Sequence, residues 1–441
     1  MSTTADQLLM TVPSLSKTLT TIRIEKYCAE PVYHIDILLS TCENLLDLHL
    51  EAVPTEFTGP VRLELRPESD LWLNKTETSL RLRWLTIKYW RVSSKVMETL
   101  LPHCRLVKSL EVVDISGLSS PLSLFYRLVA ECLPSLEHIQ ITCQSDRMQL
   151  FDAIVFQEVF DRVKSWSIDP RDIQEGMWRL TDPVPPVLTF ENIFPSLTSL
   201  SVMGGYYSFG YNDYSDAIHT YLISPAAESL VHLKVERYRF QIVYRNPDSL
   251  KYRRPWTCWR LETLHLDMLN DSRAMPSASD SRIVLNYLTQ LLPRMRTLTL
   301  KFNIFDFGLY GGLCFLKRMR YLESAYLVSK KYGAISKRDL HWLDTSSTVP
   351  TVCRKAWMTQ LWGQQHSTTL TSSKESLKDL AKCLQDSDDD GGSLPCLESL
   401  ILETRRLNSR SDFGKSDADM VQFMKSLRPD CYFRIVRESE Y

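Results

Sequence analysis

Residues 133–141 read LPSLEHIQI and contain the pattern on which the fold prediction rests. The apolar residues Leu136, Ile139 and Ile141 are spaced three and then two positions apart. On a β-strand, side chains two positions apart point to the same face, so Ile139 and Ile141 are expected to be buried together. Pro134 ends any preceding helix and sends the chain onward in an extended conformation. The stretch therefore predicts a short strand with one buried face.

The same spacing recurs along nearly the whole chain. A proline again stands two residues before the first apolar position at Pro195, Pro293 and Pro395. Most motifs begin about 25–37 residues after the previous one, which is typical of long, helix-containing leucine-rich repeats. The motifs begin at Leu19, Leu45, Leu82, Val107, Leu136, Val163, Leu197, Leu230, Leu261, Met295, Leu322 and Leu397.

One-sided helical patterns lie between these strands. Residues 94–101 begin with a capping serine, Ser94, and place apolar side chains at helical spacing, and residues 283–291 form another apolar stripe. We therefore predict an α/β fold, a leucine-rich-repeat solenoid (horseshoe) with a parallel sheet on its concave side and helices on its convex side. The alternative is an ordinary α/β domain, but that fold favours longer apolar strands and glycine-rich turns.

A solenoid of this kind forms a single domain, here predicted over residues 1–441, because its core grows along one axis. Residues 328–394 break the period and are predicted to be an insertion, with helices at 337–343 and 376–384. Residues 415–441 are predicted to be a C-terminal cap, made of a helix around 420–427 and a last strand at 431–436.

Composition limits the class of protein. Lys and Arg total 52 against 53 Asp and Glu, a net charge of −1, so a nucleic-acid partner is not expected. The start of the chain lacks the pattern of a signal peptide, and no apolar run is long enough for a membrane helix, so no membrane contact is expected. The 11 cysteines form no C-x-x-C pair, which favours free thiols and a cytoplasmic or nuclear location.

Several stretches resemble functional motifs without completing one. Residues 386–391 match the first half of a calcium loop, but Leu397 occupies the position of the bidentate glutamate, so an acidic surface loop is predicted. Residues 204–211 form an aromatic loop that either only connects two elements or contacts a partner. The basic, aromatic residues 237–260 either form a solvated flank or bind an acidic group. His103 and Cys104 have no second ligand pair. No catalytic residue, metal or cofactor is predicted.

Residues that alternate with the buried strand positions must point to the concave face, and solenoids use that face for binding. This rule also places Arg23, Glu25, Thr86, Thr299 and Lys301 there. The candidate partner-binding residues are Asp47, His49, Glu51, Trp84, Lys88, Glu111, His138, Gln140, His232, Lys234, Glu236, His265 and Asp267.

Residues 133–141 and 194–200 resemble the strand motifs of fungal F-box/leucine-rich-repeat proteins, which are RNI-like, and the resemblance covers residues 19–436. It implies that the repeats bind a substrate protein, while an F-box docks the Skp-type adaptor of a cullin ubiquitin ligase. An F-box is not evident, since the first motif already begins at Leu19, so the adaptor is expected as a partner only if an F-box lies upstream.

The predicted function is a non-catalytic protein–protein interaction module that recognises a substrate as F-box-type receptors do. Two alternatives remain. One is a leucine-rich-repeat regulatory protein such as a GTPase activator, although those repeats are more uniform, near about 28–29 residues. The other is a standalone scaffold without a role in ubiquitin ligation.

Overall fold

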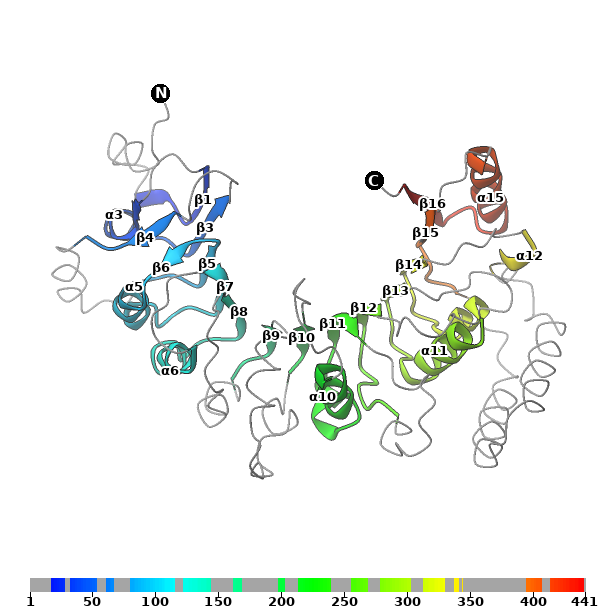
Figure 1. Ribbon diagram of the computed structural model, residues 1–441, viewed down its shortest axis with the longest axis horizontal. Coiled ribbons are helices and arrows are strands. Elements are labelled where there is room, and N and C mark those ends of the chain that lie inside the picture. Colours follow the sequence, from blue (N-terminus) through cyan, green and yellow to red (C-terminus); the bar gives the residue numbers. More distant parts are fainter. Residues whose placement is uncertain are drawn as a thin grey trace. The chain divides into compact units, whose positions relative to one another are not determined.

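The computed structural model describes residues 17–27, 32–53, 61–66, 80–115, 122–143, 162–168, 197–202, 213–238, 255–268, 278–302, 312–329, 337–340, 343, 394–406 and 413–439. The chain divides into two compact units, unit 1 (Met1–Tyr214) and unit 2 (Ser215–Tyr441). Each unit contains an open sheet of parallel strands with helices beside it (Figure 1).

In the described part of unit 1, seven parallel strands form the sheet, and their spatial order follows the chain. The strands are β1 (Thr21–Tyr27), β3 (Asp47–Val53), β5 (Trp84–Lys88), β7 (Ser109–Ile115), β8 (His138–Cys143), β9 (Ser165–Ile168) and β10 (Ser199–Val202). Each strand contains the last two apolar residues of a predicted motif. The motif residues therefore mark these strands correctly.

The strand register aligns these apolar residues across unit 1. Leu48 lies opposite Leu85, and Leu85 lies opposite Leu110. All three are at most 1% exposed. One strand contributes only two or so apolar side chains to this face, so their burial requires an adjacent strand on each side. Fully burying one such side chain contributes about 1.5–3 kcal/mol. At the edge of the sheet, Ile22 and Ile24 of β1 are only partly buried.

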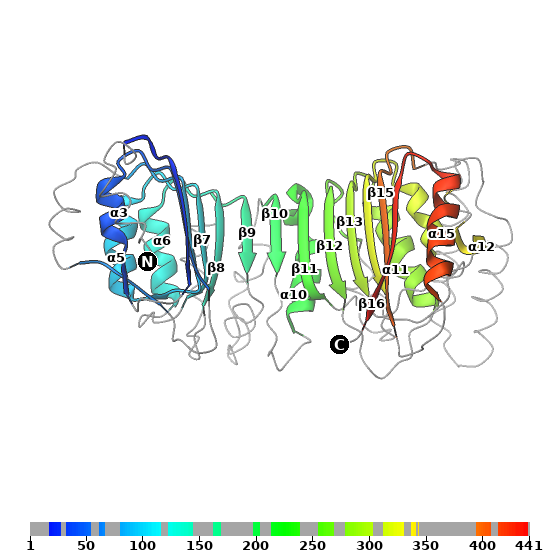
Figure 2. The same ribbon diagram turned by 90° about the horizontal axis from the view of Figure 1, so that it is seen from above.

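Helices cover one face of the unit 1 sheet (Figures 1 and 2). They are α3 (Ile35–Thr41), α5 (Ser94–Leu100), the short 3₁₀ helix η1 (Leu101–His103) and α6 (Leu122–Cys132). The cap of α5 is Ser93, one residue before the predicted Ser94, because the Ser93 side chain accepts a hydrogen bond from the Val96 N–H. On the helix side lies a second, small parallel sheet of β2 (Val32–His34), β4 (Arg62–Glu64) and β6 (Arg91–Val92), which the sequence did not predict.

Unit 2 repeats this plan with six parallel strands. They are β11 (His232–Tyr238), β12 (Thr263–Met268), β13 (Thr297–Phe302), β14 (Ser324–Ser329), β15 (Ser399–Arg406) and β16 (Tyr432–Ser439). Its helices are α10 (Asp213–Leu222), η2 (Pro225–Ser229), α11 (Ala278–Leu291), η6 (Leu313–Arg318), α12 (Lys337–Leu340) and α15 (Phe413–Leu427).

The predicted insertion at 328–394 does not interrupt the unit 2 sheet. β14 pairs directly with β15, so that Leu327 lies opposite Leu402, and both side chains are fully buried. The chain therefore leaves the sheet after β14 and returns to the adjacent position. Within this segment, α12 covers the first four residues of the helix predicted at 337–343, and residues 341 and 342 lie outside the described residues. The helix predicted at 376–384 and the acidic loop at 386–391 lie outside the described residues.

The predicted α/β class with a large parallel sheet is confirmed. The predicted helices at 94–101, 283–291 and 420–427 correspond to α5, α11 and α15, and the last two begin earlier than predicted. The terminal strand predicted at 431–436 corresponds to β16. The leucine-rich-repeat solenoid and the single-domain organisation stay predictions.

Candidate functional site

The polar face of unit 1 consists of the side chains that alternate with the buried leucines and isoleucines. In the strand register, Arg23 lies opposite His49, His49 opposite Thr86, Thr86 opposite Glu111, and Glu111 opposite Gln140. A second row, nearer the start of each strand, runs through Asp47, Trp84, Ser109 and His138. The structure therefore brings all eight candidate residues of unit 1 onto one face.

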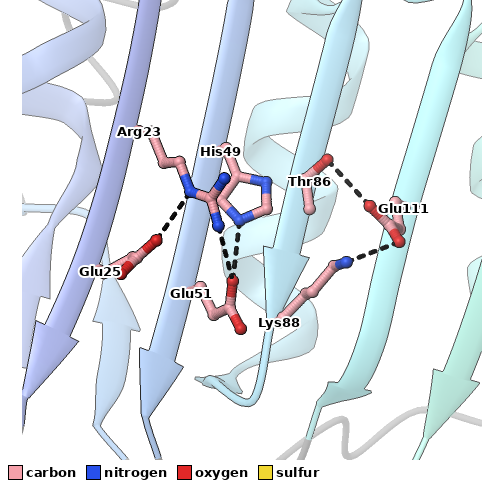
Figure 3. A network of polar contacts seen from close by, with 7 residues as sticks. All are labelled: Arg23, Glu25, His49, Glu51, Thr86, Lys88 and Glu111. Carbon is pink, nitrogen blue, oxygen red and sulfur yellow. Dashed lines mark hydrogen bonds and ion pairs between the residues drawn. The ribbon is translucent and has the colours of Figure 1, made fainter.

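The first part of this face is a charged cluster around Glu51 (Figure 3). Glu25 and Glu51 lie opposite each other in β1 and β3, and such like charges repel. Arg23 offsets this repulsion, since its guanidinium lies 2.8 Å from Glu25 and 3.8 Å from Glu51. His49 Nε2 lies 3.0 Å from Glu51. The hydrogen bond to His49, and then the charges of His49, Lys88 and Arg23, lower the pKa of Glu51.

The second part of the face centres on Glu111. Lys88 Nζ lies 2.8 Å from one carboxylate oxygen of Glu111, and the Thr86 hydroxyl donates to the other at 3.2 Å (Figure 3). The Lys88 and Glu111 side chains are 23% and 28% exposed, so solvent screens this ion pair less than a fully exposed one. The pair therefore holds both side chains in defined positions on the face.

Trp84 is the large apolar group of this face. It is the first residue of β5 and is 44% exposed, although β-strands normally bury rings of this size. Aromatic side chains such as Trp are enriched at protein–protein interfaces. Trp84 lies opposite Asp47 and Ser109 in the register. The face thus combines an accessible ring with anchored charges.

The polar face of unit 2 holds the other five candidates. Lys234 of β11 lies opposite His265 of β12, and Lys234 Nζ lies 3.0 Å from Glu236. Asp267 lies opposite Lys301 of β13. His232 is exposed and lies opposite Thr263. All five therefore share one face of the unit 2 sheet.

His265 differs from an ordinary surface histidine. Burial, together with the positive charges of Lys301 and Lys234, lowers its pKa to about 4, against a smaller opposing effect of Glu236. The ring is therefore neutral at physiological pH. Its ring nitrogens then offer one donor and one acceptor for a polar partner.

Sequence reasoning missed Tyr326 on this face. Its hydroxyl donates a hydrogen bond to the carboxylate of Glu403, and it lies opposite Thr299 in the register. The motif at Leu322, Ala325 and Leu327 has alanine at its central position, and this weak match hid the alternation that places Tyr326 beside the candidates. Because Tyr326 lies between the motif residues Ala325 and Leu327, the same alternation places it on the polar face.

A further charged row precedes the strands in each unit. In unit 1, Glu137 lies 3.1 Å from both Lys108 and Lys164. In unit 2, the charges are reversed, because Arg296 lies 3.6 Å from Glu262 and 3.0 Å from Glu323. In unit 1, the backbone N–H of Glu137 donates to the Lys108 carbonyl, and that of Lys164 donates to the Glu137 carbonyl. In unit 2, the N–H of Arg296 donates to the Glu262 carbonyl, and that of Glu323 donates to the Arg296 carbonyl. The charges therefore link consecutive strands.

The remaining sequence motifs add little. Residues 204–211 and most of 237–260 lie outside the described residues. Burial raises the pKa of the Cys104 thiol to about 12, so Cys104 stays protonated. Among the residues that the structure describes, no group of three or more His, Cys, Asp or Glu side chains is arranged to hold a metal ion. No described helix combines the length and the apolar character needed to cross a membrane.

Comparison with known proteins assigns the chain to no group. No protein-family model matches the sequence, and no curated protein is significantly similar to it.

Proposed function

We propose that the chain is a leucine-rich-repeat solenoid that binds another protein through the polar faces of its sheets. In this proposal it recognises the substrate of an F-box-type ubiquitin ligase. The repeated apolar spacing and its alignment in the parallel register support the repeat architecture. Among the residues that the structure describes, the helices lie on one face of each sheet, and the proposal assigns the opposite, polar face to a partner.

The observation that carries protein binding is the composition of the unit 1 face. Trp84 is exposed, and on the same face Lys88 and Glu111 hold each other in an ion pair. Ordering these long side chains before binding lowers the entropic cost of association. Aromatic anchors surrounded by polar groups are typical of the residues that dominate binding energy.

The ligase role rests on the resemblance of residues 133–141 and 194–200 to fungal F-box/leucine-rich-repeat motifs. The irregular motif spacing favours this role over a GTPase activator, whose repeats are more uniform. A standalone scaffold would share the binding face and lack the adaptor. Binding of the Skp-type adaptor therefore distinguishes the ligase role from the standalone scaffold.

The test is quantitative affinity capture of the full chain from cells, compared with Trp84→Ala and Glu111→Lys. We expect both variants to lose the same partner by about tenfold or more. Glu98→Lys is the matched control, because it makes the same charge change at an exposed position on α5. It should retain the partner.

Each outcome decides a separate part of the proposal. If both face variants capture the same proteins as the unmodified chain, the polar face of unit 1 is not the binding surface. A Skp-type adaptor that co-purifies with the unmodified chain and with Glu111→Lys supports the ligase role. If purified adaptor fails to bind the full-length gene product directly, the ligase role is wrong and the scaffold alternative stands.

A further inference from the structure

Unit 1 contains a cavity of about 440 Å³ on the helix side of its sheet. Its walls come from three elements: β4 contributes Arg62 and Leu63, β6 contributes Arg91, and α5 contributes Lys95 and Val96. Figure 1 shows β4 and β6 beside α5, on the side of the sheet where α3 lies. The cavity is thus separate from the polar face.

Four cationic side chains line this cavity, and one of them is already neutralised. Arg66 Nε lies 2.7 Å from the buried carboxylate of Asp36, whose other oxygen accepts from the Arg66 N–H at 3.2 Å. Arg62, Arg91 and Lys95 form no ion pair with any residue that the structure describes. Among the described lining residues, Glu64 is the one carboxylate. The lining therefore has an excess of positive charge.

The position of two of these cations is electrostatically unfavourable. Arg62 and Arg91 lie directly opposite each other in the pairing of β4 with β6. Like charges at such positions destabilise a sheet. The whole chain is nearly neutral, with a net charge of −1, so the excess is local. A bound anion would relieve the repulsion between the two guanidinium groups.

We propose that this cavity binds a small organic phosphate ester. Guanidinium groups match the oxygen geometry of phosphate and bind it through paired hydrogen bonds, and a lysine adds a point charge. The buried Leu63 and Val96 supply an apolar wall for the organic part. A volume of about 440 Å³ falls within the range of small-ligand pockets. This site is independent of the proposed protein-binding function.

The test is calorimetric titration of the full chain with phenyl phosphate, inorganic phosphate and sulfate at one ionic strength. We expect phenyl phosphate to bind with a dissociation constant below about 1 mM and more tightly than either inorganic ion. Arg91→Gln and Lys95→Gln should each weaken binding by about tenfold. Lys95 is exposed on α5, so its variant leaves the pairing of β4 with β6 intact.

Arg105→Gln is the matched control, because Arg105 is exposed in the turn before β7, outside the cavity. It should bind phenyl phosphate as the unmodified chain does. Equal affinity for phenyl phosphate in Lys95→Gln and the unmodified chain would overturn the proposal. A phosphoserine peptide, or vesicles containing a phosphoinositide, that bind while phenyl phosphate does not would also overturn it, in favour of a macromolecular ligand.

Discussion

The polar faces of the two units differ, while their buried faces are alike. In unit 1 the face is held by ion pairs, with Glu51 and Glu111 each contacted by a cation. In unit 2 the corresponding rows hold the ion pair of Lys234 with Glu236, the hydrogen bond from Tyr326 to Glu403 and the neutral ring of His265. Both sheets bury a row of mostly leucine and other apolar side chains on the other side.

The difference between the polar faces shows that the two sides of each strand are restricted in different ways. The buried residues must fill the space between sheet and helices, so their size and apolar character are restricted in both units. The residues on the polar face need only remain compatible with a strand, so their chemistry diverges. Because salt screens the ion pairs of unit 1, while pH changes the charge of His265 in unit 2, the two faces should respond differently to solution conditions.

The largest expected effect tests the similarity of the buried faces. Leu50→Ala in unit 1 and Leu300→Ala in unit 2 each remove a fully buried side chain at the same motif position. Each should lower the free energy of unfolding by about 2–5 kcal/mol, because a cavity remains. Hydrogen exchange measured by mass spectrometry should show the loss of protection in the unit that carries the substitution.

Leu106→Ala is the control for this comparison, because Leu106 is 46% exposed in the turn before β7. It should change the free energy of unfolding by less than about 0.5 kcal/mol. If Leu300→Ala were as mild as Leu106→Ala, the two buried faces would not be equivalent.

The next prediction concerns the pH dependence of the free energy of unfolding, to which His265 of unit 2 contributes. The folded pKa of His265, about 4, lies below the ordinary value of 6.5, so the unfolded chain takes up the proton first as pH falls. The free energy of unfolding should therefore decrease as pH falls from 6.5 to 4. His265→Gln should remove up to about 2 kcal/mol of that decrease, after allowance for solvent screening.

Thr299→Val is the matched control, since Thr299 lies opposite His265 and does not titrate. It should shift the unfolding free energy by a constant amount at every pH. Chemical denaturation between pH 4 and 7 measures both variants. A His265→Gln curve parallel to that of the unmodified chain would show that His265 does not contribute.

The smallest effect tests the charged face of unit 1. Lys88→Gln and Glu111→Gln each remove one partner of a partly buried ion pair. A double-mutant cycle should give a coupling energy of about 0.5–1 kcal/mol at low salt, which decreases in 1 M salt because of screening. A coupling energy that is unchanged in 1 M salt would contradict the description of this face as held by charge.

Local patterns accounted for much of the fold. The apolar spacing located the strands, as in Leu136, Ile139 and Ile141, because alternation along a strand depends only on the sequence itself. The same alternation placed His49, Lys88 and Glu111 on one face. The helix at 94–101 was predictable because its capping serine and apolar stripe are local signals.

Other features depended on contacts between distant residues. The pairing of β2, β4 and β6 joins three short segments with weak strand patterns, so none was recognised from the sequence. The contact of Arg23 with Glu51 arises only when β1 lies beside β3. The pKa of His265 depends on burial and on lysines in both neighbouring strands.

The sequence by itself determined the alternation of buried and polar positions, because side-chain direction on a strand follows from backbone geometry. It therefore specified which residues could form a binding face in each unit. Only the tertiary structure decided which of these residues are neighbours, and so which charges are paired. The opposition of Arg62 and Arg91 shows the reason: their spacing across two strands is set by hydrogen bonding between segments, which no local pattern encodes.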